Sequence, residues 1–425
     1  MNNLNFIIIK CDFDGKVLTF DKSAENLFGC SALDVIGIKR IYNFLHPDFI
    51  INFSKDFSLI INKKKFFFNK KVFCLHSDNS EFLATLFIER DVNNFITIKI
   101  KKEQFVNNTI KTKVINFDKI NLIIRSKFVI GSFIPFFFSI IWSIYRFKFI
   151  DYSLIFLIFL GVFFLHVAAN TFNDYFDWKS GRDKKNIDYV LFSTGGSRAV
   201  DFKIISEKHL LFISIFSFIL VFIIGLYFVY LNGIIILIVG LIAFFSVYFY
   251  SAPPIHLASR YGLGELMHIF CLGPLIIYGS SIILSNNNAE FIDFFVGFPF
   301  GLLITGCLLM NEYPDSKFDK LCGKINLAVV LGKHYIPYMY LFFLFMSFCV
   351  IMFGITFFKF PKIFYLVVLM IPYSLITVKS VFKISVSRKF IADSCLKSFN
   401  LYFYFSLIFT FALLLHVIFI KFNPW

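Results

Sequence analysis

Two kinds of hydrophobic pattern divide this chain near Arg125. Before that residue, short apolar runs alternate with polar and turn residues, as in a soluble domain of mixed α and β structure. After it, apolar runs of roughly 16 to 23 residues follow one another, which is the length that a bilayer core requires. Backbone groups in lipid must be paired within their own segment, so we expect these runs to be transmembrane helices. The predicted spans are Phe128–Tyr145, Tyr152–Ala169, Leu210–Leu231, Ile234–Tyr250, Leu266–Leu284, Phe291–Leu309, Tyr335–Phe357, Ile363–Val378 and Leu401–Ile420.

The N-terminal region predicts a small α+β domain. Turn residues separate its short β-prone runs. The expected elements are strands over Phe6–Lys10 and Lys16–Phe20 around a turn at Asp12–Gly15, a helix over Ser23–Phe28, strands over Lys71–Leu75 and Phe82–Ile88 around a turn at Asp78-Asn79, and a closing strand over Ile96–Ile100. We therefore divide the chain into a soluble domain over residues 1–105, a basic linker over residues 106–127 and a membrane domain over residues 128–425.

Composition and charge agree with a membrane protein. Hydrophobic residues make up 58% of the chain and charged residues only 16%, whereas soluble proteins carry about a quarter charged residues. The net charge of +15 has its ordinary sources in topology signals and in attraction to anionic lipid. Because these ordinary sources account for the charge, nucleic acid is not an expected partner. The eight cysteines include no CxxC pair, so neither zinc nor a redox dithiol is predicted.

The distribution of basic residues predicts the orientation in the membrane. Loops after the second, fourth, sixth and eighth spans carry roughly seventeen Lys and Arg residues, against about five on the opposite side. The positive-inside rule then places these loops and the N-terminal domain in the cytoplasm of a multi-pass cell-membrane protein.

Two acidic clusters follow the second and sixth predicted spans. The first reads NDYFDWKSGRD from Asn173 to Asp183, and the second reads NEYPDSKFDK from Asn311 to Lys320. In each, an Asp follows the Asn by four residues, and residues four apart share one face of a helix. Carboxylates gathered at a membrane boundary are costly unless a cation neutralises them, and Mg²⁺ prefers carboxylate and phosphate oxygens. The two clusters predict a metal–diphosphate site; the alternative is solvated acids at the ends of spans.

These motifs resemble those of the UbiA superfamily of intramembrane prenyltransferases. NDYFDWKSGRD is similar to its first aspartate-rich motif, NEYPDSKFDK followed by GKINLAVVLGK is similar to its second, and YSAPPIHLASRYGLGEL is similar to the signature between them. The interval from Asp177 to Asp183 and the TGGSRA stretch are similar to the branch that prenylates 1,4-dihydroxy-2-naphthoate in menaquinone biosynthesis. Departures from the family pattern, Arg125-Ser126 and Arg198-Ala199, leave the identity of the acceptor open.

The resemblance implies an all-α bundle of about nine transmembrane helices with Mg²⁺-dependent transferase activity. A polyprenyl diphosphate would ionise at its allylic C–O bond, and an aromatic acceptor would attack the resulting carbon. Other acceptors stay open: 4-hydroxybenzoate, a haem, a chlorin or a lipid glycerol ether. Two alternatives from other classes are a membrane receptor without enzymatic activity and an ion transporter, which would place its acids near the midplane.

The implied roles of individual residues follow from the motifs. The expected Mg²⁺ ligands are Asp174, Asp177, Asp183, Asp315 and Asp319, with Asp177 and Asp315 central to catalysis. The expected diphosphate-binding residues are Asn173, Lys179, Arg182, Arg198, Asn311 and Lys324. Tyr250 and Arg260 are expected to line the pocket over the reacting carbon. The alternatives are positive-inside charges for the cations and an interfacial aromatic role for Tyr250. His256 is a further basic candidate, and the turn at 195–197 offers backbone N–H groups to phosphate or is a plain loop.

The soluble domain resembles a PAS domain. The pieces DFDGKVLTFDKSAENLFG, DVIG and HPDF are similar to the opening strands and helices of that family. The resemblance implies either a sensor for an unknown small ligand or a ligand-free structural or dimerising module.

Overall fold

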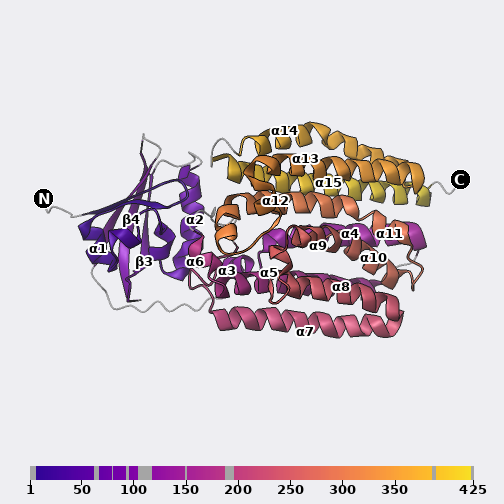
Figure 1. Ribbon diagram of the computed structural model, residues 1–425, viewed down its shortest axis with the longest axis horizontal. Coiled ribbons are helices and arrows are strands. Elements are labelled where there is room, and N and C mark those ends of the chain that lie inside the picture. Colours follow the sequence, from indigo (N-terminus) through magenta and orange to yellow (C-terminus); the bar gives the residue numbers. More distant parts are fainter. Residues whose placement is uncertain are drawn as a thin grey trace. The chain divides into compact units, whose positions relative to one another are not determined.

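The computed structural model describes residues 6–61, 67–78, 80–91, 95–103, 117–148, 151–186, 196–384 and 389–422 (Figure 1). The chain divides into two compact units. The first unit comprises Met1–Leu122 with Arg198–Ser206, and the second comprises Ile123–Ser197 with Glu207–Trp425. Each unit is described by itself below.

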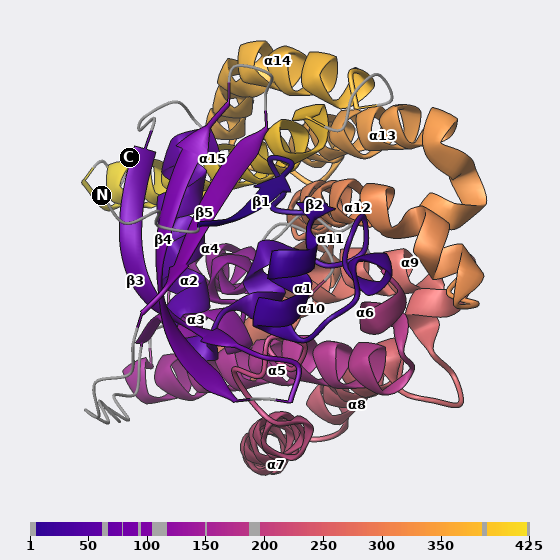
Figure 2. The ribbon, with the colours of Figure 1, turned by 90° about the vertical axis from the view of Figure 1, so that its left-hand side faces the viewer.

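The first unit is built on a five-stranded antiparallel sheet with the strand order β2-β1-β5-β4-β3. The strands are β1 (Ile7–Cys11), β2 (Val17–Phe20), β3 (Phe67–Leu75), β4 (Glu81–Arg90) and β5 (Ile96–Lys102). Between β2 and β3 the chain forms α1 (Lys22–Phe28), η1 (Ala32–Asp34), η2 (Ile41–Phe44) and α2 (Pro47–Ile61). Helix α1 packs on β1 and β2, and α2 packs on β3 and β4 (Figure 2). This order of two strands, short helices and a meander is the predicted one.

Local sequence chemistry explains the first hairpin and helix. Asp12 Oδ1 accepts the N–H groups of Asp14 at 2.9 Å and Lys16 at 2.8 Å, which forms the predicted turn. Gly15 completes it with φ +77°, a conformation that favours glycine. Asp21 caps α1 by accepting the Ala24 N–H at 2.8 Å. The predicted hairpin is confirmed for β3 and β4, which run longer than expected, while Asn79 of its turn lies outside the described residues.

Helix α2 is the element of this unit that the sequence reasoning missed. Its apolar positions recur every three to four residues and are buried against the sheet: Ile50, Ile51, Phe53, Phe57 and Ile60. The Phe53 and Phe57 rings also contact the Tyr42 ring edge-on, at centroid distances of 5.7 and 5.8 Å. A core filled by aromatic rings in this way holds the short strands together, because each buried ring removes a large apolar area from water.

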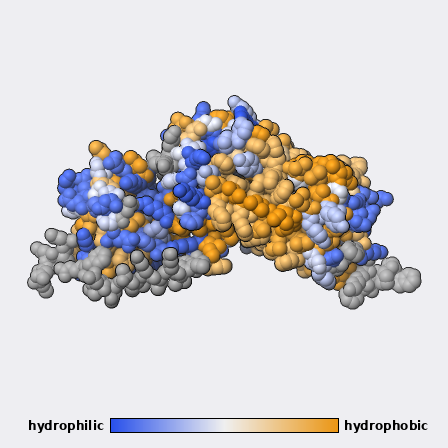
Figure 3. Space-filling model, turned by 90° about the horizontal axis from the view of Figure 1, so that it is seen from below, coloured by the Kyte–Doolittle hydropathy of each residue, from blue (hydrophilic) through white to orange (hydrophobic). Residues whose placement is uncertain are grey.

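The second unit consists of helices, and nine segments of its described residues are long and apolar enough to cross a membrane. This agrees with the predicted number of spans. Hydrophobic side chains cover most of the visible face of these helices (Figure 3). The elements are α4 (Ser126–Phe147), α5 (Tyr152–Lys179), α6 (Arg182–Lys185), α7 (Glu207–Asn232), α8 (Ile234–Ser251), η3 (Leu257–Ser259), α9 (Leu263–Cys271), α10 (Pro274–Leu284), α11 (Phe291–Phe295), α12 (Phe298–Leu321), α13 (Leu327–Phe357), η4 (Lys362–Met370), α14 (Ile371–Phe382) and α15 (Lys389–Phe422). A further helix, α3 (Phe117–Ile123), precedes α4 in the predicted linker.

Two of the predicted spans are broken helices. The fifth span is split into α9 and α10, and the sixth is split into α11 and α12. The breaks meet at glycines: a Cβ at Gly273 would lie 2.2 Å from the Gly297 carbonyl oxygen, and one at Gly301 would lie 2.0 Å from the Ile269 carbonyl oxygen. A hydropathy pattern does not reveal such breaks, because glycine is compatible with an apolar run and its close backbone contact is a tertiary feature.

Helix α12 contributes to a hydrophobic core that it shares with α4 and α15. Its Phe300 ring lies 5.0 Å from Phe138 of α4 and 5.5 Å from Phe409 of α15, measured between centroids. Both α5 and α12 continue past the predicted spans, to Lys179 and Leu321. The acidic clusters therefore occupy the last turns of two long helices, which fixes the direction of their side chains.

Candidate active site

The second acidic motif begins on α12 around a proline. Pro314 lacks an N–H, so the Met310 carbonyl one turn earlier loses its usual helical donor. The Cys395 thiol of α15 lies 3.5 Å from that carbonyl and donates to it instead. The helix therefore continues through Pro314 and carries Asp315 and Asp319, both buried at 8% exposure, on one face.

A direct hydrogen bond joins the two motifs. Asn186, which directly follows α6, donates from Nδ2 to Asp315 Oδ1 at 2.7 Å. Helix α6 itself packs against α12 and carries Asp183 and Arg182. The first motif thus reaches the second through the short helix that begins with its last two residues. Asn186 was not a predicted site residue, because it lies outside the repeated pattern and its role depends on how α6 folds back.

Arg182 organises the first motif. Its Nη1 lies 2.7 Å from Asp177 Oδ1, and its Nη2 lies 2.9 Å from His256 Nε2. Burial, and then the positive charge of Arg182, lower the pKa of His256 to about 4. The imidazole is therefore neutral at physiological pH and accepts a hydrogen bond from the guanidinium. His256 belongs to the YSAPPIHLASRYGLGEL signature, so this contact connects that signature to the first motif.

Lys324 is placed between the carboxylates of both motifs. Its Nζ lies 3.6 Å from Asp319 Oδ2, and Asn326 donates to the same carboxylate oxygen at 3.0 Å. Burial alone would lower the pKa of Lys324, but Asp319, Asp177 and then Glu312 raise it above its ordinary value. A single ammonium therefore interacts with α5 and α12 together and stays charged across the physiological pH range.

Asp174 is held by a cation that the sequence reasoning noted only as a departure from the family pattern. Arg125, at the start of α4, forms a hydrogen-bonded ion pair with Asp174 Oδ1. The Ser197 N–H lies 3.4 Å from each carboxylate oxygen. Gly196 has φ +79°, and a Cβ there would lie 2.8 Å from Arg125 Nη2 and 2.9 Å from Asp174 Oδ1. The described part of the predicted turn at 195–197 therefore faces a protein carboxylate, and Gly195 lies outside the described residues.

The remaining predicted residues have varied contacts. Asn173 Oδ1 accepts the Ser251 hydroxyl of α8 at 2.7 Å, and Lys179 donates to the Tyr175 hydroxyl at 3.3 Å. Arg260 is exposed and donates to the carbonyls of its own loop, Ile255 at 2.7 Å and Pro254 at 3.2 Å. These bonds hold the signature loop in shape and direct the Arg260 guanidinium to that loop, while its backbone forms a bridge with Ile325 after the second acidic motif.

Three further predicted residues are Tyr250, Asn311 and Arg198. Tyr250, in the last turn of α8, is near enough to Lys324 to interact with it electrostatically. Asn311 lies on α12 one turn before Asp315. Arg198 belongs to the first unit, where its Nη1 lies 3.9 Å from Asp201 Oδ2. The structure thus brings Tyr250 to the motifs and does not place Arg198 relative to them.

Two buried glutamates, one of them within the second motif, were not assigned a role from the sequence. Glu265 of α9 is 2% exposed, and its Oε1 accepts the Leu327 N–H at the start of α13 at 2.7 Å. Glu312 of α12 is 6% exposed, and its carboxyl lies within hydrogen-bonding reach of the Glu265 carboxyl. Two carboxyl groups this close repel each other as anions, so a proton or a cation is expected between them.

The donor set fits Mg²⁺. No three His, Cys, Asp or Glu side chains within the described ranges converge closely enough to hold a metal by themselves. Mg²⁺ is usually held by one or two carboxylates, with the remaining positions taken by substrate phosphates and water. Asp177, Asp315 and Asp319 offer such oxygens.

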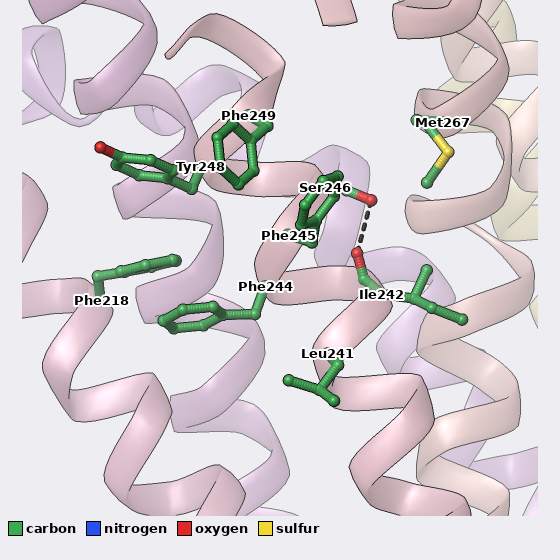
Figure 4. Close-up of a pocket in the computed structure, with 9 residues that line it drawn as sticks. All are labelled: Phe218, Leu241, Ile242, Phe244, Phe245, Ser246, Tyr248, Phe249 and Met267. Atoms are coloured by element: carbon green, nitrogen blue, oxygen red, sulfur yellow. Dashed lines mark hydrogen bonds between the residues drawn. The ribbon is translucent and has the colours of Figure 1, made fainter. Parts of the chain in front are cut away.

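An apolar groove lies on the bundle side of the first motif. It has a volume of about 760 Å³ and is lined by residues of α7, α8 and α9: Phe218, Leu241, Ile242, Phe244, Phe245, Ser246, Tyr248, Phe249 and Met267 (Figure 4). The Ser246 hydroxyl bonds the Ile242 carbonyl at 2.6 Å, so the lining presents no free polar group there. The Tyr248 ring lies 6.3 Å from that of Phe176, the residue before Asp177. The groove therefore suits an apolar chain whose polar end lies at the motif.

Comparison with known proteins gives distant relatives. The chain is 23% identical over 202 residues to 1,4-dihydroxy-2-naphthoate octaprenyltransferase of Bacillus subtilis, covering 48% of this chain and 62% of that protein. It is 28% identical over 200 residues to UbiA prenyltransferase domain-containing protein 1 of Dictyostelium discoideum, covering 45% and 57%. The chain thus spans about six tenths of the length of these curated relatives.

Solved structures with a similar arrangement include two archaeal UbiA homologues. The one from Aeropyrum pernix K1 gives a TM-score of 0.48 at 14% identity, over 69% of this chain and 98% of that chain. The one from Archaeoglobus fulgidus, bound to GPP and Mg²⁺, gives 0.48 at 16% identity, over 68% and 99%. The model of the UbiA prenyltransferase family matches residues 132–408, which is more than half of the chain. The protein therefore belongs to the UbiA prenyltransferase family.

Proposed function

We propose that this protein transfers an isoprenoid group from a prenyl diphosphate to an aromatic acceptor in the membrane. The observation that carries the proposal is the meeting of two carboxylate-bearing helix ends, linked by the Asn186–Asp315 hydrogen bond and by Lys324. A diphosphate with its metal ions needs oxygen ligands and fixed cations within one site. Membership of the family supports the same conclusion.

The proposed reaction breaks the allylic C–O bond of the donor. The bonding electrons leave with the diphosphate, an aromatic carbon forms the new C–C bond, and the ring then loses a proton. Arg182 and Lys324 are positioned to stabilise the growing negative charge, and their ion pairs with Asp177 and Asp319 hold them in place before the reaction. Mg²⁺ held by Asp177, Asp315 and Asp319 would supply Lewis-acid stabilisation of the same leaving group. Asp174 and Asp183 are proposed as further ligands, and Asn173 and Asn311 as groups that orient the diphosphate.

The isoprenoid chain is proposed to lie in the apolar groove along α8. Its lining is aromatic and aliphatic and is partly exposed toward the lipid side, with Leu241 56% and Phe245 47% exposed. Phe176 connects the lining to Asp177 through the Tyr248 ring. A chain in this position would have its diphosphate at the acidic motifs and its tail in contact with the bilayer.

We propose 1,4-dihydroxy-2-naphthoate as the acceptor, which assigns the protein to menaquinone biosynthesis. The name of the Bacillus subtilis relative supports this choice. The second candidate is 4-hydroxybenzoate. Full-length protein in nanodiscs, supplied with geranyl diphosphate and Mg²⁺, is expected to prenylate the naphthoate at a kcat/KM well above that for hydroxybenzoate. Prenylation of neither compound, with no diphosphate released, would contradict the proposed function.

The orientation and the first unit also enter as proposals. The excess of Lys and Arg beside the acidic motifs supports a cytoplasmic position for that end of the bundle and for the first unit, in a cell membrane. The order of two strands, four helical segments and a three-stranded meander supports a PAS-like module that binds a small ligand and regulates transfer. A chain that starts at Ile123 keeps Arg125 and is the appropriate variant for testing regulation: full activity that no longer responds to cell metabolites would support it, and an unchanged response would contradict it.

A further inference from the structure

Two histidines lie inside the helical bundle, away from the acidic motifs. His166 is on α5 and His268 is on α9, both within segments long and apolar enough to span the membrane. His166 Nδ1 lies 2.5 Å from the Ser132 hydroxyl of α4, and His268 Nδ1 lies 2.9 Å from the Thr305 hydroxyl of α12. The imidazoles are close enough for His166 to act electrostatically on His268. Four helices therefore build one polar cluster in otherwise apolar surroundings.

The atom of this cluster that is left to bind a ligand is a histidine ring nitrogen. Because each Nδ1 is bound to a hydroxyl, Nε2 is the nitrogen left on each ring to bind something else. His166 Nε2 is buried and has no hydrogen-bond partner among the residues that the structure describes. A buried polar atom without a partner is costly, and in an apolar span an aliphatic side chain would avoid that cost. We therefore expect this nitrogen to bind a group from outside the chain.

The spacing between this cluster and the first motif matches the proposed reaction. His166 precedes Asp174 by eight residues on the same helix, which corresponds to about 12 Å along α5 at 1.5 Å per residue. An acceptor must approach the allylic carbon from the side away from the leaving diphosphate, which is the side of the bundle interior. A rise of this size leaves room for one aromatic ring between the histidines and the motif end of α5.

We propose that His166 and His268 bind the oxygen substituents of the acceptor's aromatic ring and so position its reacting carbon. This inference rests on the proposed function and adds to it the class of acceptor: an aromatic ring with two oxygen substituents, one for each histidine. A neutral imidazole nitrogen either accepts from a hydroxyl or donates to a carbonyl or phenolate oxygen. The Ser132 and Thr305 hydroxyls orient the rings, because they hold each Nδ1 and so direct each Nε2.

The test is steady-state kinetics of the full chain in nanodiscs. The probes are geranyl diphosphate with Mg²⁺ as donor, and 1,4-dihydroxy-2-naphthoate or 1-hydroxy-2-naphthoate as acceptor. In His166→Leu and His268→Leu, the KM for the dihydroxy acceptor is expected to rise roughly three- to tenfold, the range for the loss of one hydrogen bond. The KM for geranyl diphosphate is expected to stay unchanged. His166→Gln, which keeps a donor and an acceptor, is expected to recover part of the loss.

A matched control and a matched substrate separate binding from general damage. His416→Leu removes a histidine from the α15 span, where its ring contacts Tyr145 at 5.5 Å, and is expected to leave both KM values unchanged. In the unsubstituted protein, an acceptor that lacks one hydroxyl is expected to have a higher KM than the dihydroxy acceptor. Once the histidine that binds this hydroxyl is replaced by leucine, the two acceptors are expected to have similar KM values.

The failures of the two proposals are distinguishable. If the unsubstituted protein prenylates the naphthoate and both leucine variants keep its acceptor KM, the histidine proposal is overturned and the proposed function stands. An equal rise of the acceptor and donor KM values in these variants would also overturn it, because the cluster would then be structural. If the unsubstituted protein releases no diphosphate with any acceptor, the proposed function fails first.

Discussion

The bundle holds buried carboxylates at both of its ends, and the two groups differ in how completely they are paired. At the end opposite the motifs, Asp293 of α11 is fully buried and saturated: Oδ1 accepts from Trp142 at 2.7 Å and Arg146 at 3.2 Å, and Oδ2 accepts the Glu290 N–H at 2.7 Å. At the motif end, Arg182 Nε is buried without a partner among the described residues, and the carboxyls of Glu265 and Glu312 lie beside each other.

This difference distinguishes a structural polar cluster from a binding site. A saturated buried network stabilises one arrangement of helices and has no capacity for a ligand. An incompletely paired network costs stability until a ligand completes it, and natural proteins retain such sites where they have a function. Substitutions at the two ends are therefore expected to change different measured quantities.

The largest effect is expected for Asp177→Asn and Asp315→Asn. Each removes a carboxylate from the motif end, and transfer of geranyl diphosphate is expected to fall by about 10²–10³ in kcat, as when one charge-stabilising group is removed. Thermal stability is expected to stay within a few degrees, because asparagine keeps an oxygen that can accept the hydrogen bonds of Arg182 and Asn186. The measurement is product formation beside a melting curve, with Glu290→Gln, whose side chain is 69% exposed at the other end, as control. Unchanged kcat in both variants would remove the proposed site.

Lys324→Gln is expected to lower kcat by roughly 10², because one ammonium serves the carboxylates of both helices. Its raised pKa means that the native state keeps the proton to higher pH than the unfolded chain does. The contribution of Lys324 to stability is therefore complete below its ordinary pKa and is lost only as the pH rises through the raised value. A rate profile between pH 7 and 9 that shows an alkaline decline in the unsubstituted protein but not in Lys324→Arg would contradict this assignment.

Asp293→Asn is expected to lower stability and to leave activity unchanged, which is the opposite of the effect expected for the motif variants. It removes a fully buried charge that two donors of α4 bind, and the free energy of unfolding is expected to fall by about 2 kcal/mol. Activity per folded molecule is expected to stay unchanged, since α4 and α11 meet at the far end of the bundle. Denaturation in mild detergent and initial rates on the folded fraction measure the two quantities. A loss of kcat without a loss of stability would break the comparison between the ends.

The smallest effect is expected for His256→Gln, which keeps an acceptor for Arg182 at the motif end. The lowered pKa of His256, about 4, means that the unfolded chain binds the proton first as the pH falls. Its stabilising contribution is complete above the ordinary histidine pKa near 6.5 and is lost between that value and about pH 4. The melting temperature of the unsubstituted protein is therefore expected to fall more steeply over this window than that of His256→Gln. Parallel curves would show that His256 is not buried beside a cation.

Much of the fold followed from patterns along the chain. Apolar runs of membrane-spanning length predicted the spans, and alternating short runs predicted the sheet, because both depend on local periodicity. The breaks at Gly273 and Gly297 were missed, since they arise where two backbones meet. Helix α2 was missed because its apolar period lies within a short segment of mixed composition.

The candidate site was recognised in part for a similar reason. The two Asn-x-x-x-Asp repeats could be read from the sequence because helical spacing places their members on one face. Arg125, Asn186 and Glu265 carry no such repeat, and they were found only through their contacts with Asp174, Asp315 and the Leu327 N–H. Arg260 illustrates the reverse case: it lies within a recognised signature, but its guanidinium bonds its own loop.

The amino-acid sequence by itself determined that this chain has a membrane bundle with acids at two helix ends, preceded by a mixed soluble unit. Hydropathy and helical spacing are local properties, and they act before any long-range contact forms. The tertiary structure alone decided which charges are saturated and which are left unpaired. That outcome depends on groups more than a hundred residues apart, such as Asn186 with Asp315 and Trp142 with Asp293, which only folding brings within hydrogen-bonding distance.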